Sequence, residues 1–235
     1  NCREANSALH NHDLAIERYE KALTLQPNYV DAHNICGLSL SELVQYEAAL
    51  LQFKKALTLK PNDAEIHNNM GNALQRQGQA EAALVCFEKA LALKPGVAES
   101  HNNMGGCLNT LGQHDNAISH YEKALSIKPD YVDALNNLGN VFLESGYTKQ
   151  AIARFKQVLS LKPDSAITHN SLAICLNETG KEQDAITHYE QAITLEPNFA
   201  EAHNNLGICL KSLARDKEVI NHYEQALALK PDYAS

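Results

Sequence analysis

Proline sets the period of this chain. Each of the seven prolines in its 235 residues stands 34 residues from the next, at Pro27, Pro61, Pro95, Pro129, Pro163, Pro197 and Pro231. A fixed period of this length is typical of a solenoid, in which each unit buries its apolar side only against its neighbours. The chain is therefore predicted to be one unit written repeatedly, forming one elongated domain. Positions within a unit are counted below from its preceding proline.

One unit reads as two antiparallel helices. Between Ala64 and Pro95, two apolar stripes recur at helical spacing, separated by Gly78 and closed by Pro95. The first contains Ile66, Met70, Ala73 and Leu74, and the second contains Ala83, Leu84, Phe87, Ala90 and Leu91. The fold class predicted from this pattern is all-α.

Short signals mark the start and the middle of each first helix. Asn or Asp follows most prolines and an acid stands three residues later, as in Asn62 and Glu65, which predicts a start like a capping box. Glycine recurs at position 10 although it costs about 1 kcal/mol relative to alanine in a helix, which predicts a close approach between packed helices. These glycines are Gly37, Gly71, Gly105, Gly139 and Gly207, with Ala173 in the remaining unit.

These residues resemble the tetratricopeptide repeat, a 34-residue unit. The residues that carry the resemblance are His67, Met70, Gly71, Leu74, Ala83, Phe87 and Pro95, and it extends over a partial unit at 1–29 and full units at 30–63, 64–97, 98–131, 132–165, 166–199 and 200–233. It implies a right-handed superhelical solenoid whose first helices line a concave groove that binds proteins or peptides. One departure recurs, because His33, His67, His101, His169 and His203 stand where the family usually has a large aromatic residue.

Asparagine dominates the predicted groove. Positions 4, 8, 11 and 15 lie opposite the apolar side of the first helix, and asparagine is a mediocre helix former. Its side chain both donates and accepts, which suits a peptide backbone of any sequence. The resulting row resembles the asparagine ladder of the repeat arm of O-linked N-acetylglucosamine transferases. The candidate peptide-binding residues are Asn69, Asn103, Asn137 and Asn205 at position 8 and Asn72 and Asn140 at position 11. The alternative is that these amides bond only neighbouring helices or water.

Two further columns flank the groove. The acids at position 4 form its predicted edge, either as helix caps or as a preference for basic or polar peptide segments; they are Asp31, Glu65, Glu99, Asp133 and Glu201. The asparagines at position 7, which include Asn34, Asn68 and Asn170, are expected to bond between repeats. The histidine column is expected to hydrogen-bond across the repeat interface and to make stability sensitive to acid.

Composition restricts the partners. A net charge of −8 without a basic run argues against nucleic acid, and no apolar stretch is long enough for a membrane span. The six cysteines form no disulfide framework, and Cys107, Cys175 and Cys209 share a position with Ala73 and Ser39, as expected of small buried residues. Reduced thiols fit a reducing compartment such as the cytoplasm.

The sequence contains no catalytic or cofactor-binding motif. A metal site in the histidine column is not expected either, because histidines of successive repeats would be too far apart to share one ion. The chain is therefore interpreted as a non-enzymatic protein–protein interaction scaffold that binds an extended peptide. Two alternatives stay open. The chain reads as a piece of something longer, so it could be the substrate-recognition arm of a glycosyltransferase or sulfotransferase. It could also self-associate end to end through repeats that lack polar caps.

Overall fold

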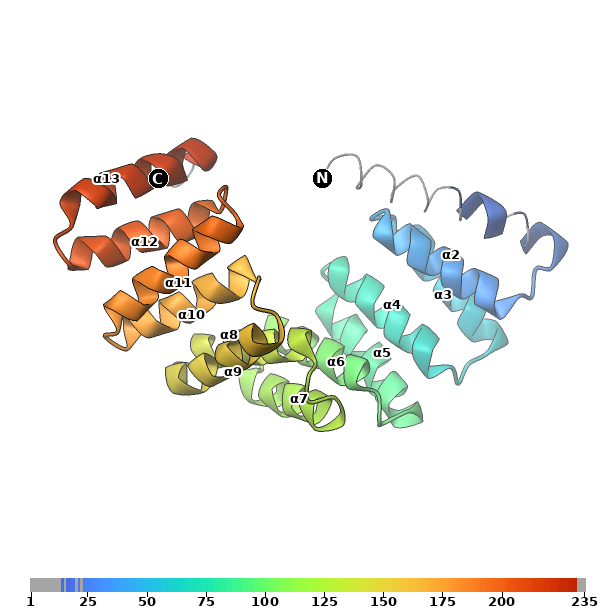
Figure 1. The fold of residues 1–235 in the computed structure, drawn as a ribbon. Helices are drawn as coiled ribbons and strands as arrows, with labels where there is room; N and C mark the ends of the chain where they lie inside the picture. Colours follow the sequence, from blue (N-terminus) through green and yellow to red (C-terminus); the bar gives the residue numbers. More distant parts are fainter. Residues whose placement is uncertain (1–13, 15, 20, 22, 232–235) are drawn as a thin grey trace. The chain divides into compact units, whose positions relative to one another are not determined.

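The chain folds into successive antiparallel helix pairs (Figure 1). A computed structural model describes residues 14, 16–19, 21 and 23–231, and no strand occurs among them. Contacts group the chain into two compact units, Asn1–Ile127 and Lys128–Ser235. The helices bounded within the first unit are α2 (Val30–Glu42), α3 (Tyr46–Leu59), α4 (Ala64–Arg76), α5 (Ala80–Leu93), α6 (Ala98–Thr110) and α7 (His114–Ile127). Those of the second unit are α8 (Val132–Glu144), α9 (Thr148–Leu161), α10 (Ala166–Glu178), α11 (Glu182–Leu195), α12 (Ala200–Ser212) and α13 (Asp216–Leu229).

The all-α fold class predicted from the sequence is confirmed, and the pair α4 and α5 begins and ends close to the predicted positions. The predicted partial unit at 1–29 falls largely outside the described residues. The division into one continuous solenoid stays a prediction.

The first helix of each pair ends in a backbone motif that does not depend on glycine. After α4, Gly78 takes a φ of 84°, and the N–H of Gln79 donates to the carbonyl of Leu74 at 2.9 Å. This is the Schellman arrangement, which satisfies carbonyls at the helix end. Val44 and Ala214 take φ values of 61° and 55° at the same position of their units. The turn thus forms even at Val44 and Ala214, whose side chains disfavour a positive φ.

The predicted capping-box start is wrong. The N–H of Tyr29 donates to the carbonyl of Gln26 at 3.2 Å, so Pro27 and Asn28 are the central residues of a β-turn before α2. Proline at the second position of such a turn is favoured, and the helix then begins only after the turn closes. Among the first helices of the described pairs, only α4 and α10 have a side-chain cap, from Asp63 and Ser165 respectively. The acids at position 4 still lie in the first turn, near the positive end of the helix dipole.

Each glycine at position 10 packs against an aromatic ring of the second helix. A Cβ atom added to Gly71 would lie 2.6 Å from Cε1 of Phe87, and one added to Gly105 would lie 2.7 Å from Cε1 of Tyr121. These rings are almost fully buried. The glycines were predicted to allow a close backbone approach between packed helices; their partner is instead an aromatic ring of the second helix.

Candidate functional site

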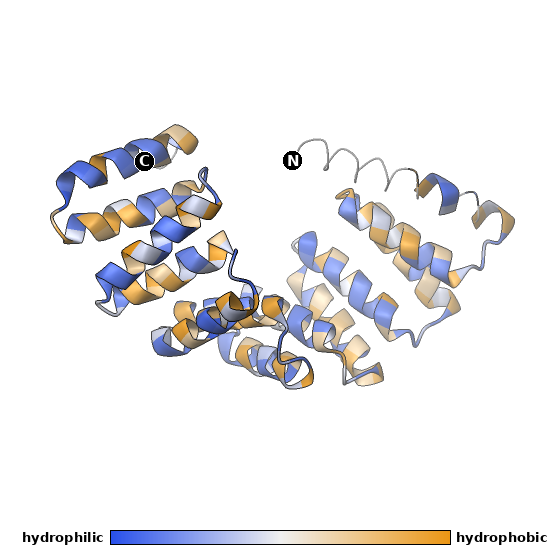
Figure 2. Ribbon diagram, in the orientation of Figure 1, coloured by the Kyte–Doolittle hydropathy of each residue, from blue (hydrophilic) through white to orange (hydrophobic). Residues whose placement is uncertain are grey.

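The face that the sequence assigned to the groove is the open face of the first helices. On α4, Glu65 and Arg76 are exposed and Asn69 and Asn72 are partly exposed, whereas Ile66, at position 5, is buried. Figure 2 shows hydrophilic residues along much of α4. The other candidates have the same setting: Asn103, Asn137 and Asn205 are partly exposed, and Asn140 is exposed.

The asparagines at position 8 are bonded to the repeat before them. Nδ2 of Asn69 donates to Oδ1 of Asn34 at 3.1 Å, and Asn103 donates to Asn68 at 3.2 Å. In the second unit, Asn205 donates to Asn170 at 3.2 Å. We call this bond the amide clasp. It links the first helices of consecutive pairs, and it uses one of the two N–H groups of each donor.

The asparagines at position 7 receive the clasp and extend it. Nδ2 of Asn34 donates to Oε1 of Glu65 at 3.4 Å, and Asn170 donates to Glu201 at 3.2 Å. The expected bonding between repeats through this column is therefore present. Glu65 and Glu201 accept these bonds and so orient the amides of Asn34 and Asn170. The remaining edge acids Asp31, Glu99 and Asp133 are exposed in the first turns of α2, α6 and α8.

A pocket of about 330 Å³ brings several candidates of the first unit together. Glu65 and Asn69 of α4 line it together with Glu99 of α6 and Leu38 of α2. Asn68 and Lys94 also line it, so two carboxylates, two amides, one ammonium group and an aliphatic side chain surround one hollow on the open face. Asn72 does not line it, and the candidates on α8 and α12 belong to the second unit.

The histidines at position 6 bond to the turn that ends the preceding repeat, and several also bond to the second helix of their own pair. The expected bond between repeats is therefore present, although its partner is the linking turn and not a neighbouring helix. Nε2 of His101 lies 3.0 Å from the carbonyl oxygen of Pro95 and must donate to it, because a carbonyl only accepts. Its Nδ1 lies 3.1 Å from Nδ1 of His120, on the second helix. His169 and His188 repeat this pairing at 2.9 Å, and His203 and His222 repeat it at 3.1 Å. His33 instead meets Oε1 of Gln52 at 2.7 Å.

The second member of each histidine pair was missed in the sequence. His120, His188 and His222 all stand at position 25, where the other described units have Gln52, Cys86 and Arg154. Counting from the prolines would have revealed this column. Only the structure shows that the ring nitrogens of this column lie within hydrogen-bonding distance of the histidines at position 6.

Burial disfavours the charged form of both rings in the pair His101–His120. It lowers the pKa of His120 to about 4, and the positive charge of Lys123 and the neighbouring His101 add to the effect. The pKa of His101 is also lowered, chiefly by burial, as are those of His188 and His222. Charging a partly desolvated ring beside a second ring is unfavourable. The pair His101–His120 therefore forms from neutral imidazoles.

The cysteines within the described residues are free and buried. Burial raises the pKa of Cys175 to about 12 and also raises that of Cys107, whose thiol donates to the carbonyl of Ala80 at 2.9 Å. A protonated, buried thiol is a poor nucleophile. The small buried role expected for Cys107, Cys175 and Cys209 is confirmed.

Metal and membrane features were also sought in the described part of the chain. No group of three or more His, Cys, Asp or Glu side chains there is placed to hold a metal ion. None of its helices has both the length and the apolar character needed to cross a bilayer. Self-association through the ends stays a prediction: α13 exposes Ile220 by 59%, while residues 1–13 lie outside the described part.

Comparison with protein-family models finds the tetratricopeptide repeat in three forms. The first matches residues 62–130 and 96–164, the second matches 45–78 and 175–213, and the third matches 202–235. Together the matches cover residues 45–164 and 175–235. No curated protein sequence matches the chain.

Solved structures with the same fold are numerous. Pseudomonas aeruginosa pilF has a TM-score of 0.75 at 21% identity, and the match covers 94% of this chain and 94% of that one. A chain of the Cut9–Hcn1 hetero-tetramer of APC/C has a TM-score of 0.79 at 18% identity, over 94% of this chain and 43% of that one. YrrB, described as a TPR protein with an unusual peptide-binding site, has a TM-score of 0.65 at 22% identity, over 77% and 94% of the two chains. Identities this low show a common fold.

Proposed function

Because this chain belongs to the tetratricopeptide repeat family, we propose that it is a protein-interaction scaffold whose first helices bind an extended segment of a partner protein. The observation that carries the proposal is the amide clasp. In the clasp, Asn69 donates one of its two amide N–H groups to Asn34. Its second N–H and its carbonyl oxygen have the capacity to bond a ligand. Asn103 and Asn205 are held in the same way.

The clasp fixes the amides before a ligand arrives. Binding normally costs about 0.5–1.5 kcal/mol for each side chain that it immobilises. An amide already held by its neighbour avoids much of that cost. The second N–H and the oxygen match the carbonyl and the N–H of a peptide group, so recognition is of backbone rather than of particular side chains. The peptide-binding site described for YrrB agrees with such a use of the fold.

The edge acids add a preference to this site. Glu65 and Glu99 line the pocket of the first unit beside Leu38, and with Lys94 as the one cation of the lining the acids remain in excess. An aliphatic stem that ends in a cation, as in lysine or arginine, matches these surroundings. A segment with a basic residue flanked by polar residues is therefore the preferred ligand. Its affinity is expected to fall as salt rises, because the contributing charges are exposed.

Peptide display followed by titration tests the proposal. Random peptides captured by the 235-residue chain are titrated by fluorescence anisotropy against the wild type, Asn69→Ala and Asn103→Ala. Loss of two peptide hydrogen bonds is expected to weaken binding about tenfold in each variant. Enrichment of peptides that bind both variants as well as the wild type would contradict the proposal.

Asn34→Ala is the matched control. It removes the acceptor of the same clasp but leaves Asn69 in place. Both Asn34→Ala and Asn69→Ala should therefore lower the free energy of unfolding by about 1 kcal/mol. Asn69→Ala should lose the peptide bonds themselves, whereas Asn34→Ala should lose only the smaller benefit of holding Asn69 in place before binding. Equal loss of affinity in the two variants would assign the amides to packing between repeats alone.

A further inference from the structure

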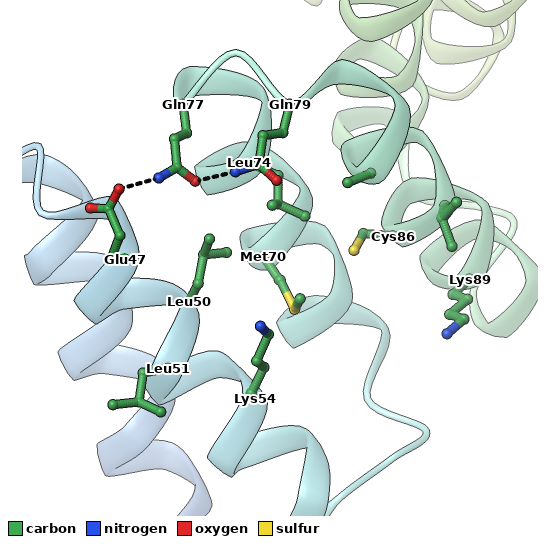
Figure 3. Close-up of a pocket in the computed structure, with 12 residues that line it drawn as sticks. Glu47, Leu50, Leu51, Lys54, Met70, Leu74, Gln77, Gln79, Cys86 and Lys89 are labelled. Carbon is green, nitrogen blue, oxygen red and sulfur yellow. Dashed lines mark hydrogen bonds between the residues drawn. The ribbon is translucent and has the colours of Figure 1, made fainter.

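A second open surface lies on the opposite helices, between α3 and α5. It is a groove of about 810 Å³ whose floor is Met70 and Leu74 of α4. Figure 3 shows Leu50 of α3 and Cys86 of α5 on its two sides. A second hollow of about 570 Å³ shares Lys89 with it and reaches His67, also on α4. The floor thus follows one stripe of α4 at helical spacing.

One end of this groove is closed by polar side chains. Nε2 of Gln79 donates to Oε1 of Gln77 at 2.9 Å, and Gln77 in turn donates to the carboxylate of Glu47 (Figure 3). The acid of the groove is therefore already bonded. Lys54 and Lys89 stand farther along the two helices, and neither forms an ion pair with the side chains that the structure describes.

Cys86 is a small residue in the wall of this groove. The next unit has the larger His120 at the same position 25, where its ring meets His101. Burial raises the pKa of the Cys86 thiol, which stays protonated and apolar. Met70 is partly exposed in the groove, whereas the residues at the same position of the other described units are buried. Methionine adapts its shape readily to a ligand.

At position 24, large aliphatic residues occur only in the two helices that form this groove. Position 24 points to solvent in every described unit, and Leu51 and Val85, which occupy it here, are 52% and 49% exposed. The other units have small or polar residues there, namely Ser119, Ala153, Thr187 and Asn221. Paired exposed aliphatic residues beside an open hollow mark an interaction surface.

The charge at the groove differs from that of most other units as well. Position 27 holds Glu88, Glu122, Glu190 and Glu224 in four units, whereas it holds Lys54 beside this groove and Lys156 in α9. Where the neighbouring groove has Glu88 across from Lys123, this one has two lysines. In a chain with a net charge of −8, that local excess of cations favours an acidic ligand.

We propose that the groove between α3 and α5 is a second docking site, separate from the face of the first helices, for a partner segment that carries aliphatic side chains and carboxylates. Leucine-sized side chains fill the hollow above Met70 and Leu74, and the carboxylates pair with Lys54 and Lys89. Such a segment is opposite in charge to the one preferred by the acidic first-helix face. The chain then holds two chemically distinct segments at once.

The probe is an N-acetylated eight-residue peptide of alternating leucine and glutamate pairs, titrated against the 235-residue chain by fluorescence anisotropy. A peptide with lysine in place of glutamate and one with serine in place of leucine are the comparison probes. We expect saturable binding of the leucine–glutamate peptide and at least tenfold weaker binding of the other two. Equal binding of the three peptides, or no binding, overturns the proposal.

Three variants and one control locate the site. Cys86→His puts at position 25 the residue found opposite a histidine in three other units, so it should fold, pair with His67 and abolish binding. Lys54→Glu should weaken binding about tenfold, whereas Lys156→Glu changes the same position of α9 and should leave it unchanged. Val85→Ser tests the aliphatic wall at an exposed position and should weaken binding about fivefold.

Each outcome of these measurements either supports or overturns the proposed docking site. If Cys86→His keeps the helical circular dichroism of the wild type and its affinity for the peptide, the groove is not the site. If Cys86→His does not fold, Lys54→Glu and Val85→Ser decide in its place, because both residues are exposed. If sedimentation shows a wild-type dimer that dissociates in Cys86→His while no peptide binds, the occupant is a second copy, and the proposal is wrong.

Discussion

At the scale of single residues, the contact between a glycine and a ring sets how closely the two helices of a pair approach. The aromatic residue at position 26 lies over the glycine at position 10, and rings such as Phe53, Phe87 and Phe155 are almost completely buried. Glycine costs helix stability, and the burial of the ring offsets that cost. In the pairs that have this glycine, the ring occupies the place of a Cβ atom, whereas α10 has Ala173 at the same position.

Two adjacent glycines of α6 separate this packing role from simple helix weakening. A Cβ atom at Gly105 would lie 2.7 Å from the Tyr121 ring, so Gly105→Ala is expected to lower the free energy of unfolding by about 1–3 kcal/mol. At Gly106 the nearest atom is the flexible Nε2 of Gln75 at 3.3 Å. Gly106→Ala should raise stability by up to about 1 kcal/mol. Urea unfolding followed by circular dichroism measures both, and equal effects of the same sign would contradict the packing argument.

Residue-level features were predictable where they depend on spacing, and not where they depend on partners. The small residue at position 10 followed from the recurrence of Gly71 and its equivalents. The helix end at Gly78 was also predicted, yet Val44 forms the same turn, because main-chain bonds rather than glycine define it. The cap at Asn62 was not realised, since the turn that begins with Pro61 moves the helix start to Ala64.

At the scale of helical elements, the histidine pairs tie the first helix of a pair to its second. His101, which donates Nε2–H to Pro95, must accept at Nδ1 when neutral, so His120 donates Nδ1–H to it. The ring centroids are 5.3 Å apart, which places the two nitrogens between the rings. A proton added to Nδ1 of His101 removes the acceptor. The link therefore depends on a neutral His101.

Mild acid is expected to destabilise this link. The pKa of His120 in the folded chain is about 4, below the roughly 6.5 of an unfolded histidine, so between these values the unfolded chain binds more protons. The free energy of unfolding then falls as the pH falls through this window. The loss at pH 5 should be on the order of 1 kcal/mol for this pair, after allowance for its partial exposure. Thermal unfolding at pH 7.5 and pH 5 measures it, and an unchanged melting temperature would contradict it.

His120→Gln is the control for that prediction. Gln52 already stands opposite His33, and an amide turned either way can donate to a neutral ring or accept from a charged one. The variant should keep the link at pH 7.5 and lose less stability on acidification than the wild type. If it loses as much, the acid sensitivity arises outside the histidine pairs.

At the scale of the whole molecule, each helix pair depends on its immediate neighbours. In the unit Lys128–Ser235, α10 packs on α9 and α11, while α12 and α13 meet the rest of the described unit only through α10 and α11. Stability in such an array is approximately a sum of units and interfaces. The amide clasp between Asn170 and Asn205 is one term of the interface.

Only part of the candidate site could be predicted from the sequence, because some of its hydrogen bonds form between neighbouring repeats. The exposed stripe of the first helices followed from helical periodicity, and Asn69, Asn103 and Asn205 lie on it. Their bonds to Asn34, Asn68 and Asn170 join residues 35 positions apart, so they appear only when neighbouring repeats are stacked. The groove above Met70 was missed for the same reason, because its walls come from separate repeats.

Hydrogen exchange should show this dependence directly. Opening α12 and α13 breaks one interface with a neighbouring pair, whereas opening α10 and α11 breaks two, so amides of α12 and α13 are expected to exchange at a lower free energy. Asn205→Ala removes the clasp and should speed exchange in α12 and α13 about fivefold, with α10 and α11 changed less. Lys211→Ala, at an exposed position of α12, should leave the rates unchanged. Mass spectrometry of exchanged fragments measures each helix separately. Uniform exchange rates over the four helices would mean that they unfold together, so that the interfaces do not contribute separately to the free energy of unfolding.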